Sequence, residues 1–231
     1  MSTYLQLCTY LRQQSSDAGT GPSAVTSQTG DLARIVKWVA DSWTEIQQEK
    51  DEWRWMRKSF TVSATSGDGA YAYTDCTDTV NLAAISRFSK WHKDSFKCYL
   101  TSAGVGAEYP LTWIPWEQFR GIYRYGTQTN APPCHVSEDP TQKFVLGPIP
   151  DATYTVSGDY QIGPQTLAAD GDIPEMPTRF HNLIVYDALI RYGFNRVAPE
   201  VLQFAQAQGS RLHSALVRDQ LPQISLGRPL A

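Results

Sequence analysis

Residues 19–47, GTGPSAVTSQTGDLARIVKWVADSWTEIQ, pass from a glycine-bearing polar lead-in directly into an amphipathic helix. From Gly30 onward the apolar side chains recur at the i, i+3, i+4, i+7 spacing of a helix that is buried on one side. This apolar stripe consists of Leu32, Ile35, Val36, Val39, Trp43 and Ile46. Thr29 is placed to cap the helix, and Asp31 lies in its first turn, where a negative charge is favourable. The segment therefore predicts a helix that packs on a core along one face.

The opposite face of this helix is charged. Arg34, Asp41 and Glu45 lie there with Lys37, and mixed charge of this kind suits either solvent or contact with a neighbouring chain. Trp38 lies at the border between the two faces. Because Trp is highly buried on average, Trp38 is expected to pack beneath nearby strands, but Trp is also enriched at protein interfaces. The sequence leaves both interpretations of Trp38 open.

The composition limits the classes of protein to which the chain can belong. The chain has 231 residues, of which 42% are hydrophobic, enough for one large or two small domains. Its 20 basic and 23 acidic residues give a net charge of −3, so no overall basic field favours nucleic-acid binding. No apolar run approaches the roughly 20 residues that span a bilayer, and no secretory signal is found. The four cysteines contain no C-x-x-C pair, which indicates reduced thiols in a chain synthesised in the cytoplasm.

The sequence contains none of the common motifs for nucleotide binding, catalysis or metal binding. The glycines of the lead-in lack the Lys and Ser or Thr of a phosphate loop, and Pro22 removes a backbone donor. Neither H-E-x-x-H nor G-x-S-x-G occurs, and the four histidines are scattered. Cys134 and His135 are neighbours whose side chains should point apart in an extended segment. The acidic groups at 68–78 and 170–175 lack EF-hand spacing. We therefore expect no metal, no cofactor and no catalytic residue.

The middle of the chain is strand-like. From Trp53 to Val62 the pattern has a period of two, and SGDG at 66–69 reads as a turn before a returning strand at 70–74. This pattern predicts a hairpin. Further strands are expected at 80–89, 95–102, 143–147 and 152–162, with a short helix at 116–125.

Both ends are helical. A short helix is expected at residues 4–14, and the stretch PTRFHNLIVYDALIRYG predicts a central helix because it is apolar nearly all round. Its polar residues Asp187, Arg191 and Asn195 fall four apart and form a narrow strip. A final helix should run from Pro199 to about Leu221.

These elements predict an α+β fold, in which N- and C-terminal helices form a bundle and an antiparallel β subdomain is inserted between them. The expected segments are an N-terminal helical part at 1–52, a β-rich insertion at 53–169, a C-terminal helical part at 170–221 that completes the bundle, and a tail at 222–231.

The lead-in with its helix, then FHNLIVYDALIRYG, APEV and RDQLP, together resemble the adaptor proteins of tailed bacteriophages, which join the capsid portal to the tail. The resemblance covers both helical ends in the same order, and the strand region corresponds to the β insertion of that family by position. No metal, nucleotide or catalytic residue is expected in that family, in agreement with the motif search.

The resemblance implies a structural virion protein at the head-to-tail interface. Neighbouring copies would form a ring, usually of about twelve, around a channel that DNA passes through without specific binding. The partners would be the portal, the adjacent copies and a tail or nozzle protein, with no membrane involved. The flexible lead-in would let the N-terminal segment lie against the next subunit. Trp38, Arg34, Asp41 and Glu45 would then contribute to contacts between subunits.

The last residues, QISLGRPLA, are too short and too interrupted to build a core. They are either a frayed end or an extended segment that docks on a partner. By the resemblance, the C-terminal extension reaches the portal, and its binding residues would be Ile224, Leu226, Arg228 and Leu230.

Two other functions stay open. The content of seven Trp and twelve Tyr, together with the strands, would suit a carbohydrate-binding or receptor-binding tail module. A cell-wall hydrolase would use loop acids such as Asp172 or Glu175. The first leaves the long flanking helices unexplained, and the second has no catalytic motif.

Overall fold

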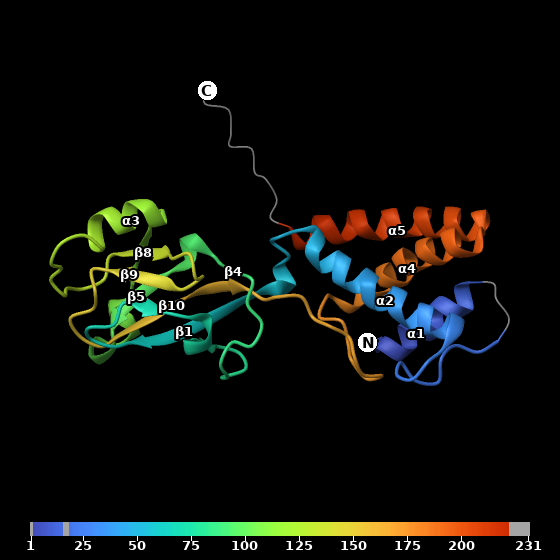
Figure 1. The fold of residues 1–231 in the computed structure, drawn as a ribbon, viewed down its shortest axis with the longest axis horizontal. Helices are drawn as coiled ribbons and strands as arrows, with labels where there is room; N and C mark the ends of the chain where they lie inside the picture. Colours follow the sequence, from blue (N-terminus) through green and yellow to red (C-terminus); the bar gives the residue numbers. More distant parts are fainter. Residues whose placement is uncertain (1, 16–18, 222–231) are drawn as a thin grey trace, which may run out of the picture. The chain divides into compact units, whose positions relative to one another are not determined.

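The computed structural model describes residues 2–15 and 19–221, which form two compact units (Figure 1). The helical unit contains the described residues up to Trp55 and those from Pro164 to Leu221, and the β unit is Met56–Gly163. The predicted α+β class is confirmed, with the sheets lying between the N- and C-terminal helices along the chain.

The helical unit is organised around a central helix. Its helices are α1 (Tyr4–Gln14), α2 (Gly30–Glu49), α4 (His181–Arg196) and α5 (Pro199–Gln220). Helix α4 packs against each of the other three, as expected for a helix that is apolar nearly all round. Its fully or almost fully buried residues include Leu183, Ile184, Val185, Ala188, Leu189 and Tyr192.

The N-terminal segment folds onto its own chain. A methyl group added at Gly21 would lie 2.8 Å from Thr9 Cα, so the lead-in packs directly against α1. The Val25 amide donates to Asp170 Oδ1 at 2.6 Å, and the Tyr4 hydroxyl donates to the Val36 carbonyl at 2.7 Å. Helix α1 is thus buried on α2 and α4 of the same chain, and contact of this segment with a neighbouring subunit stays a prediction.

His181 anchors the first residues to α4. Its side chain is 1% exposed; Nδ1 accepts from the Ser2 amide at 3.4 Å, and Nε2 lies 3.1 Å from the Met176 carbonyl oxygen. These partners fit a neutral ring with its proton on Nε2. Burial lowers the pKa of His181, which favours this neutral form in the fold.

The β unit contains two sheets among its described residues. The larger has the order β3–β1–β10–β5–β6, with β4 also paired to β10, and the smaller has the order β2–β9–β8–β7. The larger consists of β1 (Arg57–Ala64), β3 (Thr77–Asp78), β4 (Lys90–Trp91), β5 (Lys97–Leu100), β6 (Tyr109–Pro110) and β10 (Tyr154–Gln161). The smaller consists of β2 (Ala70–Tyr71), β7 (Thr112–Trp113), β8 (His135–Glu138) and β9 (Phe144–Gly147). All pairs are antiparallel except β7 with β8.

The predicted hairpin is wrong. After the turn, β2 pairs with β9 in the second sheet, whereas β1 pairs along its whole length with β10. The period-two pattern starts too early as well, because Arg54–Met56 form a 3-10 turn before β1.

The strand predicted at 80–89 is also wrong. Asp78 Oδ1 accepts from the Val80 amide at 2.7 Å and from the Asn81 amide at 2.9 Å, so the carboxylate stabilises a turn there. Leu82 then adopts a positive φ of 52°, which ends any extended run. Within this range only Ala84 makes an isolated bridge, to Thr77.

Aromatic side chains hold the two sheets together. Phe60 of β1 is fully buried, and its ring centroid lies 4.8 Å from that of Trp91 and 5.9 Å from that of Phe144 in the second sheet. Phe96 joins the same cluster at 5.6 Å from Phe60. Such pairs add about 0.5–1.5 kcal/mol each beyond the area they bury. The core of the β unit therefore depends on ring packing between its sheets.

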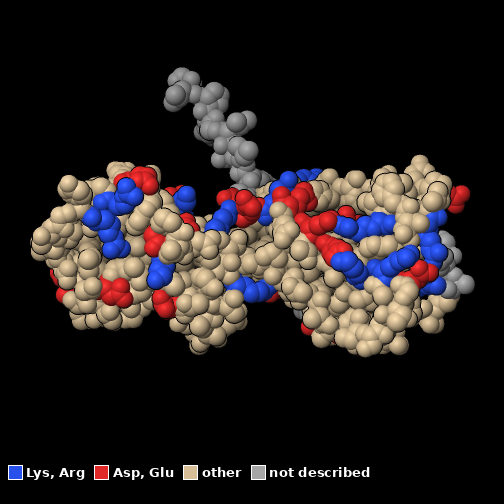
Figure 2. Space-filling view, in the orientation of Figure 1, with Lys and Arg blue, Asp and Glu red and all other residues tan. Residues whose placement is uncertain are grey.

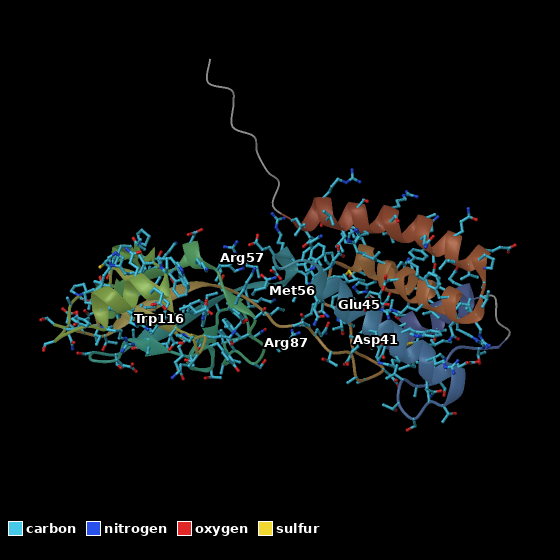
Figure 3. All side chains as sticks on the ribbon, turned by 45° about the horizontal axis from the view of Figure 1, so that its top comes forward. Asp41, Glu45, Met56, Arg57, Arg87 and Trp116 are labelled. Atoms are coloured by element: carbon cyan, nitrogen blue, oxygen red, sulfur yellow. The ribbon has the colours of Figure 1, made fainter. Side chains whose placement is uncertain are left out.

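Helix α3 (Trp116–Tyr123), whose start is labelled in Figure 3, covers the end of β9. A methyl group added at Gly147 would lie 2.5 Å from Tyr123 Cδ2 and 2.8 Å from Phe119 Cε2. Only glycine lets the two rings pack this closely on the strand.

We predict that Gly147→Ala lowers the free energy of unfolding of the β unit by about 1–3 kcal/mol, because the new methyl group displaces α3. Gly121→Ala is the matched control, since nothing lies within 4 Å of a methyl group there and alanine favours the helix. Urea denaturation measures both variants. Equal stability of Gly147→Ala and the unchanged chain would contradict the packing described.

Candidate interaction surface

A polar ladder runs between α2 and α4. Residues of α4 face residues of α2 in antiparallel order: Arg196 pairs with Asp31, Asn195 Oδ1 accepts from Arg34 Nη1 at 3.4 Å, and Tyr192 packs on Trp38. Figure 2 shows acidic and basic side chains side by side over the helical unit. The ladder thus matches the two helices along their length.

The ladder continues to the far end of α2. Glu45 pairs with Arg191 of α4, and Glu49 Oε2 lies 2.7 Å from His213 Nε2 of α5. Both pairs are partly exposed, so each stabilises the fold by only about 0–1 kcal/mol. Their main effect is to fix the register of the helices rather than to add stability.

Asp187 is the residue of the polar strip whose negative charge is disfavoured by burial. It lies half-buried beside Ser42 of α2, which is fully buried. Burial raises the pKa of Asp187, while the Ser42 hydroxyl and the Arg191 charge act in the opposite direction. Ser42 Oγ is near enough to have this effect but makes no hydrogen bond of standard geometry, and Asp187 Oδ2 has no hydrogen-bond partner among the described residues. The fold therefore disfavours the ionised carboxylate.

The residues expected at contacts between subunits are engaged within the chain. Trp38 is half-buried, with its ring centroid 6.3 Å from that of Tyr192, so it packs on a helix rather than beneath strands. Asp41 and Glu45 project from α2 (Figure 3), and Asp41 Oδ1 pairs with Lys37 Nζ at 3.1 Å. Arg34, Glu45 and Lys37 keep much of their surface exposed, so these side chains can still reach a second protein.

The predicted portal-binding residues lie outside the described part of the chain. These are Ile224, Leu226, Arg228 and Leu230.

An apolar patch at the α4–α5 turn was not predicted from the sequence. Phe194 is 67% exposed, and Val197, which ends α4, is 84% exposed; we call these two residues the turn patch. Val197 adopts the left-handed conformation, with φ 53° and ψ 46°, at a helix end that normally carries glycine. A β-branched residue in this conformation is strained by roughly 1–2 kcal/mol. The signal available in the sequence was the absence of glycine between Arg196 and Pro199.

The loop acids Asp170 and Asp172 stabilise the backbone of the fold. Asp172 Oδ2 accepts from the amides of Ala168 and Ala169 at 2.7 and 2.8 Å, which lowers its pKa, and Asp170 binds the Val25 amide. In residues 2–15 and 19–221 no group of three or more metal-ligating side chains is found. Likewise, no helix in this part is long and apolar enough to cross a membrane.

The expectation that Cys134 and His135 point apart is wrong. Cys134 Sγ lies 3.1 Å from His135 Nδ1, because Cys134 precedes the start of β8 and does not share the alternation of that strand. All four cysteines are free thiols in the structure.

We predict that Asp187→Asn raises the melting temperature of the helical unit at pH 7. The pKa of Asp187 is higher in the fold than in the unfolded chain, so ionisation above that pKa opposes folding, and this penalty disappears below the unfolded pKa. The gain should therefore be present at pH 7 and absent near pH 3.

The matched control is Asp41→Asn, whose carboxylate is partly exposed, and its expected effect is within about 0.5 kcal/mol. Calorimetry at the two pH values measures both variants. A lower melting temperature for Asp187→Asn at pH 7 would mean that the carboxylate is a required partner in the ladder.

A family model described as SU10 adaptor protein matches residues 2–229 of the chain. A search of curated proteins found no match.

Proposed function

The chain belongs to the SU10 adaptor protein family, and from this membership we propose that it assembles into a ring that joins the capsid portal to the tail. Membership makes it a structural adaptor protein of a bacteriophage and a virion component. The ring, its usual number of about twelve copies, the portal contact and the DNA channel are the proposed part.

The structural observation that supports assembly into a ring is the turn patch. Phe194 and Val197 each expose an apolar side chain near the α4–α5 turn, and Val197 does so in a strained conformation. Strain of this kind persists where the surrounding structure or function requires it. Covering the patch with another copy would remove its apolar surface from water, at about 25 cal/mol per Å² buried.

A closed ring repeats one heterologous contact, so the turn patch would meet a different surface of the next copy. We propose that this surface includes the exposed side of α2, with Trp38, Arg34, Asp41 and Glu45. Trp38 would supply the half-buried aromatic surface for Phe194 and Val197. The charged residues would form the polar rim of the contact.

The tail would supply the portal contact. Ile224, Leu226, Arg228 and Leu230 alternate along the sequence, so in an extended conformation they share one face. Such a segment can dock by filling pockets with alternate side chains. A chain with a net charge of −3 has no excess of basic groups to bind phosphates. This agrees with passage of DNA, because many phosphate contacts would hold the DNA in place.

We predict that Val197→Gly stabilises the free chain and weakens ring assembly. Glycine relieves the left-handed strain, for a gain of about 1 kcal/mol, and removes an apolar contact from the patch. Stability is measured by urea denaturation, and assembly by the number of copies bound per portal in a titration.

Leu82→Gly is the matched control, since Leu82 is also exposed, at 79%, with a positive φ of 52°, but lies in the β unit. It should gain stability without losing assembly. If both variants assembled equally well on the portal, the turn patch would not be a subunit contact.

Removing residues 222–231 is predicted to abolish portal docking while the fold stays intact, because the described core of the helical unit ends with α5. Circular dichroism and thermal melting check the fold, and co-sedimentation with the portal measures docking. A truncated chain that still occupied the portal fully would remove the tail from the portal contact.

A further inference from the structure

Three side chains with polar or nucleophilic groups meet at the start of β8. Cys134 Sγ lies 3.1 Å from His135 Nδ1, the Tyr123 hydroxyl lies 2.7 Å from the same nitrogen, and Sγ and that hydroxyl are 3.7 Å apart. The thiol is exposed to solvent, whereas Tyr123 and His135 are half-buried. The bacteriophage adaptor function uses none of these groups.

The cluster is held in place by its surroundings. The Cys134 amide donates to the Gly147 carbonyl at 3.0 Å, and the Cys134 carbonyl accepts from the Thr112 amide at 2.9 Å. His135 is fixed in β8, which pairs with β7 and β9. The ring of Tyr123 packs on Gly147, where no side chain intervenes. The thiol, imidazole and phenol are therefore kept in register by backbone pairing on both sides.

This arrangement can accommodate the thiolate. In the neutral cluster the Tyr123 hydroxyl donates to His135 Nδ1, and the thiol points to the Gly147 carbonyl oxygen, 3.6 Å from Sγ. When the thiol proton moves to Nδ1, the imidazolium N–H donates to the sulfur and the Tyr123 hydroxyl can turn to the sulfur as a second donor. Burial raises the pKa of Tyr123 to about 12, so its hydroxyl keeps its proton and remains a donor.

The other three cysteines lack these features. Cys8, Cys76 and Cys98 are 0–1% exposed, and burial raises the pKa of each thiol. Buried thiols of this kind are unreactive, because reaction requires both access and the thiolate. Reactivity should therefore be confined to a single position of the chain.

We propose that Cys134 is an activated thiol, assisted by His135 and Tyr123, that forms mixed disulfides with small disulfide compounds. The Cys134 thiolate attacks one sulfur of the disulfide; a new S–S bond forms and the original S–S bond breaks. The second sulfur leaves as a thiolate, and the proton held by His135 passes to solvent. The exchange needs no further oxidant or reductant.

The test uses the full-length chain and an aromatic disulfide, 5,5′-dithiobis(2-nitrobenzoate), whose released thiolate is followed by absorbance. We expect one rapid equivalent at pH 6.5, its loss in Cys134→Ser, and no change in Cys76→Ser. His135→Gln should slow the reaction about tenfold at pH 6.5, and Tyr123→Phe by a smaller factor. At pH 10 an exposed thiol is ionised without assistance, so the three rates should converge.

The comparison of rates at the two pH values distinguishes activation of the Cys134 thiol from its exposure to the reagent. A rate in His135→Gln equal to that of the unchanged chain at pH 6.5 would overturn the proposal, and so would a rapid equivalent that survives Cys134→Ser. A reduction by the same factor at both pH values would assign His135 a structural role only, and would overturn it too. Tyr123→Phe provides the same comparison if His135→Gln fails to fold.

Discussion

The burial of α4 on nearly all sides is the constraint on which the helical unit depends. A helix surrounded by α1, α2 and α5 has little surface where polar residues can reach solvent. The polar strip of α4 lies where side chains of α2 can pair with it. Asp187, Arg191 and Asn195 lie four apart, so they project along one line of the helix. The ladder that results fixes how α2 and α4 pass each other, and it also determines which side chains of α2 remain available to a partner.

The same constraint explains the turn patch. Because α4 and α5 pack closely enough for Leu202 to lie within 3.4 Å of a methyl group placed at Gly193, the chain must reverse sharply between them. Val197 makes that reversal in the left-handed conformation, where glycine would be unstrained. Stability of the single chain does not account for a valine there, and contact with another copy is the explanation that we propose. The β unit depends instead on aromatic packing around Phe60.

The helices could be predicted from the sequence because each one carries a complete apolar period within its own residues. Helix α2 shows its stripe in local spacing, and α4 shows its central position through the lack of a polar face. Sheet pairing could not be predicted in this way. The partner of β1 lies about a hundred residues away in β10, and a nearby turn gives no sign of that. The strand predicted at 80–89 is wrong for a related reason. The turn there depends on a hydrogen bond to the side chain of Asp78, which strand periodicity does not reveal.

The surface residues were the hardest to predict. Trp38 was correctly placed at the border of a helix face, but its partner Tyr192 comes from the other end of the chain. Phe194 and Val197 carried no sequence signal except a missing glycine. The contact between Cys134 and His135 was hidden because alternation holds only inside a strand, and Cys134 lies just before one. Exposure and backbone strain are properties of the folded chain that periodicity does not report.

The measurement that tests the adaptor account most directly is the mass of the chain by light scattering, alone and after mixing with the portal of the same bacteriophage. We predict a monomer alone, and in the mixture a complex that gains the mass of roughly twelve copies. A chain that stays monomeric and ignores the portal would contradict the account. Binding of that monomer to cell-surface glycan would favour a receptor-binding tail module instead.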